Sequence, residues 1–207
     1  MGLAASDLWW KNDLYKEQCE KWGAYQAETA GMVYSAASGY ECFKGFYMPF
    51  EAYTNTYGYE KYWSRTFNVL IEKLNSVAPQ YPLICSPYKS SLYRMSKDSV
   101  YSFAVRFIEN INFRAYDIIA PQDGSGSAPP DFDKASEQNV DDFLSAFYTA
   151  SQKQVKCRFG VNIEFFSKEK GEFATATRIA KQREIANRYA DVILSFSYSH
   201  YYAPKIG

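Results

Sequence analysis

The stretch CRFGVNIEFF, residues 157–166, predicts a buried strand with a carboxylate near its carboxyl end. Its Val, Ile and Phe residues favour strand structure. Side chains alternate between the two faces of a strand, so Asn162 and Glu164 lie on the face opposite Val161 and Ile163. We therefore expect Asn162 and Glu164 to point into one shared space.

Five further segments have the same strand character, and the six starts are separated by 35 to 44 residues. These segments are MGLAA (1–5), GFYMPFEA (45–52), PLICSPY (82–88), DIIAPQD (117–123) and VILSFSY (192–198). Segments with helical periodicity lie between them, at 14–38, 59–77, 98–112, 139–154 and 176–190. This alternation predicts βαβ units and a parallel sheet, either doubly wound and open or closed into a barrel.

Polar and aromatic residues gather at the carboxyl end of every predicted strand. They are Trp9, Trp10, Glu51, Tyr88, Gln122, Asp123, Asn162, Glu164, Tyr198 and His200. A (β/α)8 barrel builds its site at that rim from several strands, whereas a doubly wound sheet concentrates it at one switch point. We therefore expect an α/β fold of the TIM-barrel type, in one domain over residues 1–207. By strand alternation, Glu51 points inward.

The predicted barrel is incomplete. Six strands and about five helices are visible, and no helix follows the last strand. We expect the first two strands and the last helix of an eightfold barrel to be absent. Since a barrel needs closure to satisfy its edge strands, we expect either that this chain is a fragment or that another chain or segment covers the open edges.

Composition argues against several classes of partner. Lys plus Arg and Asp plus Glu number 23 each, so no net charge attracts nucleic acid. No apolar run approaches the roughly 18 to 20 residues needed to cross a membrane, and no signal peptide is seen at the start.

The four cysteines lack zinc or disulfide spacing, and we expect buried free thiols. With one histidine, His200, a His-cluster metal site is excluded, and we expect no metal and no cofactor.

Aromatic residues make up 18% of the chain, including 19 Tyr. Tyr and Trp combine a flat apolar face with a polar edge, which suits sugars as well as protein interfaces. Trp9, Trp10, Tyr88 and Tyr198 are thus candidates for substrate contact, although one tryptophan is expected in the core.

The segments GLAASDLWW, KGFYMPFEA, ICSPY, DIIAPQDGSG, VNIEFF and FSYSHYYAP resemble a bacterial-type family of domains of unknown function grouped with TIM-barrel glycoside hydrolases. Members of that family carry two strands ahead of the segment that begins here at Met1. The resemblance implies a secreted or periplasmic enzyme that cleaves O-glycosidic bonds of an oligo- or polysaccharide with retention. Glu51 would end strand four as general acid/base, and Glu164 would end strand seven as nucleophile.

One departure from the retaining clan is visible: Phe50 stands where the clan has Asn before the strand-four Glu. This supports a second hypothesis, a non-catalytic glycan-binding or structural protein derived from such a barrel. A third is a barrel enzyme that holds Mg²⁺ with Glu51, Asp123 and Glu164.

Three of the candidate residues also have structural interpretations. Glu164 could form an ion pair with Arg158, Asp123 could only cap a turn, and His200 could only line the rim.

Overall fold

The computed structural model describes residues 1–4, 12–52, 60–88, 95–127, 132–154, 156–167 and 172–196, with the backbone alone for 12–17 and 172. Helices and strands alternate through these residues. The helices are α1 (Asn12–Ala37), α2 (Glu60–Val77), α3 (Lys97–Asn110), α4 (Lys134–Gln154) and α5 (Ala176–Ala186). The parallel strands are β1 (Phe46–Met48), β2 (Leu83–Cys85), β3 (Ile118–Ile119), β4 (Arg158–Glu164) and β7 (Val192–Phe196). A short antiparallel pair, β5 (Phe166–Ser167) and β6 (Glu172–Phe173), follows β4, and a 3₁₀ turn, η2 (Ser125–Ser127), follows β3.

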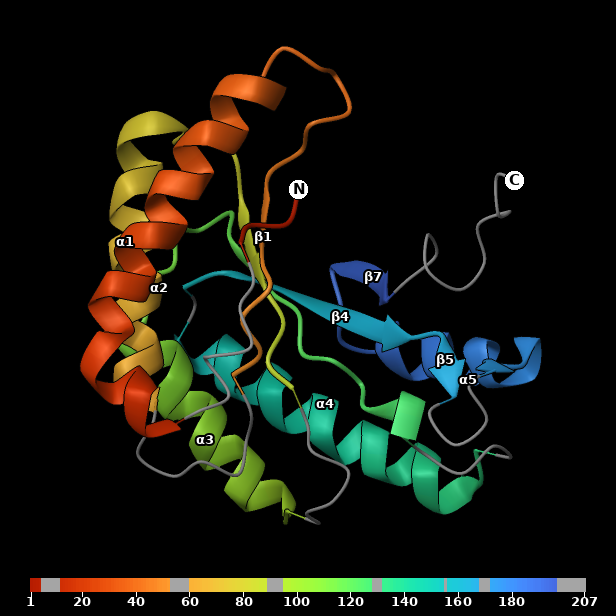
Figure 1. The fold of residues 1–207 in the computed structure, drawn as a ribbon. Helices are drawn as coiled ribbons and strands as arrows, with labels where there is room; N and C mark the ends of the chain where they lie inside the picture. Colours follow the sequence, from red (N-terminus) through yellow and green to blue (C-terminus); the bar gives the residue numbers. More distant parts are fainter. Residues whose placement is uncertain are drawn as a thin grey trace.

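The parallel strands form one curled sheet in the order β1-β2-β3-β4-β7, which is their order along the chain. The helices lie along the outer side of the curl (Figure 1). The order does not reverse anywhere among the described strands, so this part of the chain has no switch point of a doubly wound sheet. The fold is therefore mixed α/β, with a curled parallel sheet that resembles half of a barrel wall.

The strand predicted at residues 1–5 is shorter than expected. Gly2 forms an isolated parallel bridge with Tyr47, supported by hydrogen bonds from the N–H of Leu3 to Tyr47 O (3.0 Å) and from the N–H of Tyr47 to Met1 O (2.8 Å). The chain thus begins beside β1, in the place that sequential strand order requires.

Side-chain capping explains where two helices begin. Helix α4 begins five residues before the predicted start, because Asp133 accepts a hydrogen bond from the N–H of Ser136 (2.8 Å) and caps the first turn. Thr175 caps α5 by accepting from the N–H of Arg178 (3.2 Å). The prediction missed the earlier start because it followed apolar periodicity alone.

Phenylalanine fills the layer between sheet and helices. Eight Phe residues are among the largest side chains that are completely buried, and Phe103 stacks on Phe107 at 5.7 Å between ring centroids. Phe46 and Met48 of β1 are buried in this core, whereas Tyr47 between them is half-buried. The alternation predicted for this strand is therefore confirmed. Much of the aromatic content serves the core.

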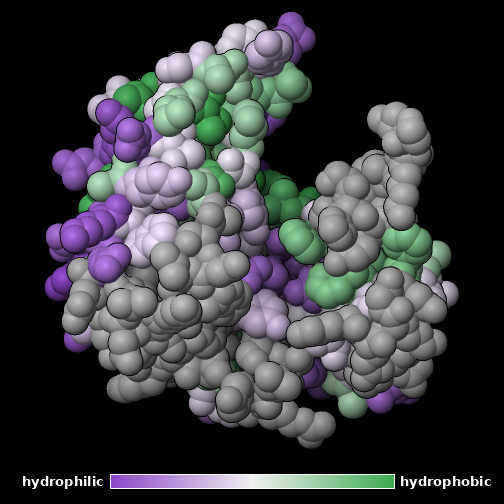
Figure 2. All heavy atoms as spheres, viewed as in Figure 1, coloured by the Kyte–Doolittle hydropathy of each residue, from purple (hydrophilic) through white to green (hydrophobic). Residues whose placement is uncertain are grey.

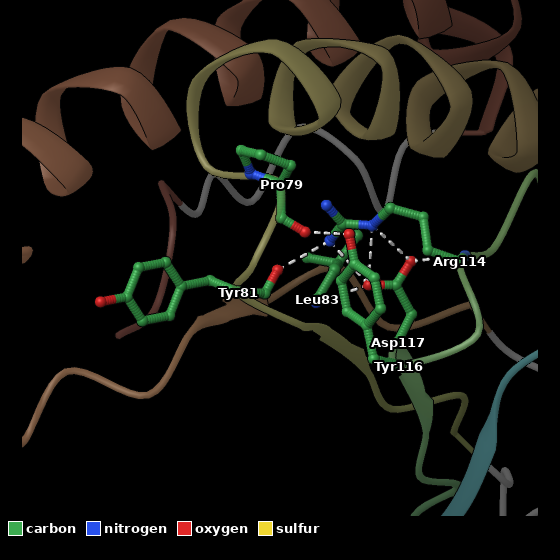
Figure 3. Close-up of polar contacts among 6 residues, drawn as sticks. All are labelled: Pro79, Tyr81, Leu83, Arg114, Tyr116 and Asp117. Carbon is green, nitrogen blue, oxygen red and sulfur yellow. Dashed lines mark hydrogen bonds and ion pairs between the residues drawn. The ribbon is translucent and has the colours of Figure 1, made fainter.

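The amino ends of β2 and β3 are joined by a buried ion pair between Arg114 and Asp117 (Figure 3). Asp117 is completely buried, and its Oδ1 accepts from Arg114 Nη2 (2.7 Å) and from the N–H of Leu83 (2.8 Å). Arg114 Nη2 also donates to Tyr81 O (2.9 Å), and the guanidinium carbon lies 4.7 Å from the ring centroid of Tyr116. A single side chain, Asp117, thus holds the start of β2 beside the start of β3.

The cysteines are free, but two of them correct the prediction that all are buried. Cys19 and Cys85 are buried and Cys157 is half-buried, whereas Cys42 is exposed. Cys42 lies in the turn after α1, where the backbone leaves the helix before β1. In the part of the chain that the structure describes, no helix has the length and apolar character to cross a membrane.

Candidate active site

The carboxyl ends of β1 to β4 bring polar side chains together, because main-chain pairing continues beyond the strands themselves. The N–H of Tyr88 donates to Ala52 O (2.7 Å), and the N–H of Gln122 donates to Pro87 O (2.9 Å). Gln122 also forms a parallel bridge with Asn162. Neighbouring strand ends are therefore held in register at the rim where the candidate residues lie.

Glu51 follows β1 and is half-buried. Gln122 Nε2 donates to its Oε1 (2.9 Å) and lies 3.3 Å from Ser86 O. Burial raises the pKa of Glu51, and the hydrogen bond from Gln122 opposes this rise because it favours the ionised form.

Glu164 ends β4 and is only 2% exposed. Its Oε2 accepts a hydrogen bond from the N–H of Gly126 in η2 (2.6 Å). Burial, followed by the negative charges of Asp123 and Glu51, raises the pKa of Glu164 to about 8, against the opposing effects of the Gly126 N–H and Arg178. Glu164 therefore keeps its proton to a higher pH than an ordinary glutamate.

Glu51 and Glu164 are close enough for the charge of one to affect the other. The charge of Glu51 contributes to the raised pKa of Glu164. Tyr88 lies near both carboxyl groups: burial raises the pKa of its hydroxyl, and the charges of Glu164 and Glu51 raise it further. Figure 2 shows the molecule hollowed near the centre of the face it presents, with polar residues in the depth of the hollow.

Asp123 is buried next to Glu164 and holds the surrounding main chain in place. Its Oδ1 accepts from the N–H of Ser125 (3.0 Å) and from the N–H of Glu164 (3.2 Å), and its Oδ2 accepts from Gln182 Nε2 (2.6 Å). Burial raises the pKa of Asp123, whereas these donors lower it. Asp123 therefore fixes both the turn after β3 and the end of β4.

Arg178 and Gln182, both on α5, complete the support and were missed by sequence reasoning. Arg178 Nη2 donates to the carbonyl oxygens of Glu164 (3.1 Å) and Phe166 (2.5 Å), and Gln182 Nε2 donates to Glu164 O (3.1 Å). Both side chains are at most 2% exposed. The signal was available, because their four-residue spacing places them on the same stripe as buried Ile185.

Asn162 does not bond to Glu164. Its Nδ2 donates to Ser86 Oγ (3.4 Å), and its Oδ1 has no hydrogen-bond partner among the described residues although the side chain is only 3% exposed. Asn162 therefore links the ends of β4 and β2.

A family model described as "Domain of unknown function (DUF4434)" matches residues 1–206. The chain belongs to the DUF4434 family. No curated protein and no solved structure matches it. What the DUF4434 chain does must therefore be argued from its own residues.

The DUF4434 chain brings six of the predicted site residues to one rim: Glu51, Tyr88, Gln122, Asp123, Asn162 and Glu164. Trp9, Trp10, Tyr198 and His200 lie outside the described residues. The alternative ion pair between Arg158 and Glu164 does not form, since these residues lie at opposite ends of β4. Asp123 matches its structural interpretation, because it is buried and accepts from the N–H two residues ahead.

The arrangement does not favour the magnesium alternative. The oxygens of Asp123 already accept three N–H donors, and no group of three or more His, Cys, Asp or Glu side chains within the described ranges is placed to hold a metal ion. What the DUF4434 site offers is a pair of carboxyl groups in different environments.

Gly126→Ala should damage this site. A Cβ at Gly126 would lie 2.5 Å from two ring carbons of Phe166 and 2.6 Å from Glu164 Oε2. We expect a loss of about 1 to 3 kcal/mol in the free energy of unfolding, measured by urea denaturation, because such overpacking forces the turn away from Glu164. Gly31→Ala in α1 is the matched control: its Cβ meets no atom within 4 Å, and we expect a gain of up to about 1 kcal/mol. Equal effects of the two substitutions would contradict the close packing at Gly126.

Proposed function

We propose that this DUF4434 chain is a glycoside hydrolase that cleaves O-glycosidic bonds of an oligo- or polysaccharide with Glu51 and Glu164. The observation that supports this proposal is the contrast between the two carboxyl groups. One is buried and has a raised pKa, and the other is half-buried with an amide donor on its carboxylate. Glycosidases need one proton-donating and one ionised carboxyl group on either side of the scissile bond.

We also propose that the curled sheet is part of a (β/α)8 TIM barrel. Two features support this: the strand order is sequential, and β1 and β4 are three positions apart in the sheet. If β1 corresponds to strand four, then β4 corresponds to strand seven, the two strands that carry the carboxyl pair in the retaining clan that the sequence resembles.

The roles that we propose are the reverse of those implied by the resemblance. Glu164 is the proton donor, because burial and the charge of Asp123 hold its proton at neutral pH. Glu51 is the nucleophile, because the Gln122 amide favours its ionised form. Glu51 attacks the anomeric carbon while Glu164 protonates the leaving oxygen, and water then hydrolyses the glycosyl-enzyme with Glu164 as base. This reaction requires no metal and no cofactor.

The proposal predicts a bell-shaped pH profile of kcat/KM. Activity should fall above about pH 8, because Glu164 then loses the proton that it must donate. It should fall on the acid side as Glu51 becomes protonated, at a pH above the ordinary range of Glu because burial raises its pKa. Initial rates on a saccharide substrate across pH 4 to 10 measure both limbs. A rate that keeps rising through pH 9 would exclude Glu164 as the acid.

The second candidate is a non-catalytic glycan-binding protein. Two observations favour it: Glu164 is only 2% exposed, and Phe50 precedes Glu51. Incubation with a panel of oligo- and polysaccharides, with detection of new reducing ends and calorimetric binding on the same samples, separates the two. If new reducing ends appear, proton NMR shows which anomer forms first. A first-formed anomer with the same configuration as the substrate supports retaining hydrolysis. Binding without new reducing ends supports the second candidate. If no glycan in the panel is bound or cleaved, both candidate functions are overturned.

A further inference from the structure

The charged groups that act on Glu164 come from three different parts of the fold. Asp123 follows β3 and Glu51 follows β1, and both are acidic, whereas Arg178 on α5 supplies a positive charge. Asp123 bonds to the main-chain N–H of Glu164, and its charge acts on the Glu164 carboxyl group. Two buried carboxyl groups that interact do not both ionise readily, so Asp123 and Glu164 compete for one proton. Arg178 balances the single negative charge that remains.

The hydrogen bonds decide which of the two carboxyl groups holds this proton. Asp123 accepts from three N–H donors, on Ser125, Glu164 and Gln182, and such donors stabilise a carboxylate. The carboxyl group of Glu164 accepts from the N–H of Gly126. The negative charge is therefore more stable on Asp123, and the proton resides on Glu164.

Asp123 is also fixed in position. Gln182 bonds both to its Oδ2 and to the main-chain oxygen of Glu164, while Asp123 Oδ1 bonds to the N–H of Glu164. Arg178 Nε donates to Gln182 Oε1 (3.3 Å) and orients the amide. The carboxylate of Asp123 thus stays beside Glu164 and keeps its donors.

We infer that Asp123 is a positioning residue that keeps the proton on Glu164, with Gln182 as the clamp that holds Asp123 in its ionised form. The catalytic consequence rests on the proposed function, since a protonated Glu164 is useful only if it acts as an acid. The location of the proton does not rest on it, because it follows from contacts in the protein alone.

The test is a titration of Glu164 in protein labelled with ¹³C at the glutamate carboxyl carbon, followed by NMR from pH 4 to 10. Glu164→Gln identifies its signal by the loss of one resonance. In the native protein we expect a midpoint near pH 8, and in Asp123→Asn a midpoint lower by about one pH unit or more, because the neighbouring charge is gone. If the protein turns over a glycoside, the basic limb of its pH profile should move by the same amount.

Gln182→Met is the second variant, since it keeps the Asp123 carboxyl group and removes one of its donors. The proton should then shift toward Asp123, and the Glu164 signal at pH 7 should move toward its ionised position. Gln138→Met is the matched control, because Gln138 is an exposed residue of α4 whose Nε2 donates to Asp142 Oδ1 (3.0 Å). A Glu164 titration that is the same in the native protein and in every variant that folds overturns the inference. A shifted titration in a protein without hydrolase activity supports the inference and counts against the proposed function.

Discussion

Glu164→Gln is expected to lower kcat by about 100- to 10,000-fold on substrates whose leaving group is a sugar hydroxyl, the usual contribution of a general acid. The amide matches the carboxyl group in shape, and its oxygen can still accept from the N–H of Gly126. The fold should therefore stay intact while the proton donor is lost. Steady-state rates of reducing-sugar release measure the effect.

A glycoside with a dinitrophenolate leaving group separates the two roles, because this group departs without a proton. On it, Glu164→Gln should still form the glycosyl-enzyme, whereas Glu51→Gln should not, since the attacking carboxylate is missing. Added azide should give Glu164→Gln a glycosyl azide of retained configuration. An azide product of inverted configuration from Glu164→Gln would instead make Glu164 the nucleophile, as the resemblance implies.

Glu184→Gln on the exposed surface of α5 is the control for this series. Its carboxylate pairs loosely with Arg188 and has a side-chain exposure of 76%. Its rate should equal that of the native protein. If Glu164→Gln behaves in the same way, Glu164 has no part in the reaction.

Asp117→Asn is expected to have the largest effect on stability, a loss of about 3 to 5 kcal/mol in the free energy of unfolding. The substitution leaves the Arg114 guanidinium, with a side-chain exposure of 8%, beside a neutral amide that offers one acceptor where the carboxylate offered two. Such a loss is a large share of the roughly 5 to 15 kcal/mol that stabilises a native domain. Urea denaturation followed by circular dichroism measures it.

The exposed pair between Arg188 and Glu184 provides the comparison for this experiment. Because both side chains are at least half exposed, Glu184→Gln should cost no more than about 1 kcal/mol. Similar losses in Asp117→Asn and Glu184→Gln would show that the buried pair does not hold β2 and β3 together.

The fold could be predicted because apolar residues recur along the sequence with the period of a helix or of a strand. The five helices and the five strands of the sheet all lie within or close to the predicted segments, since apolar side chains recur with the period of each element. What failed were boundaries set by polar contacts. The cap of α4 by Asp133 depends on one side-chain hydrogen bond, and no apolar pattern records it.

The site was predictable only in part. The alternation of side chains along each strand and their position at the strand ends predicted that Glu51, Gln122 and Glu164 lie at one rim, and the structure places them there. The protonation of Glu164 could not be predicted, because it depends on Asp123 lying against it after folding and on an amide from α5. The protonation state of a buried carboxyl group depends on residues that are far apart in the chain and close in the fold. The local sequence does not show which residues these are.

The buried ion pair of Arg114 and Asp117 lies at the amino ends of β2 and β3, whereas Glu51 and Glu164 lie at the carboxyl ends of β1 and β4, on the opposite edge of the same sheet. The contacts that hold the strands together and the candidate site residues therefore occupy separate regions of the sheet. Substitutions at the rim therefore leave the Arg114–Asp117 ion pair in place, so the residues of the rim can change while the sheet keeps the same architecture.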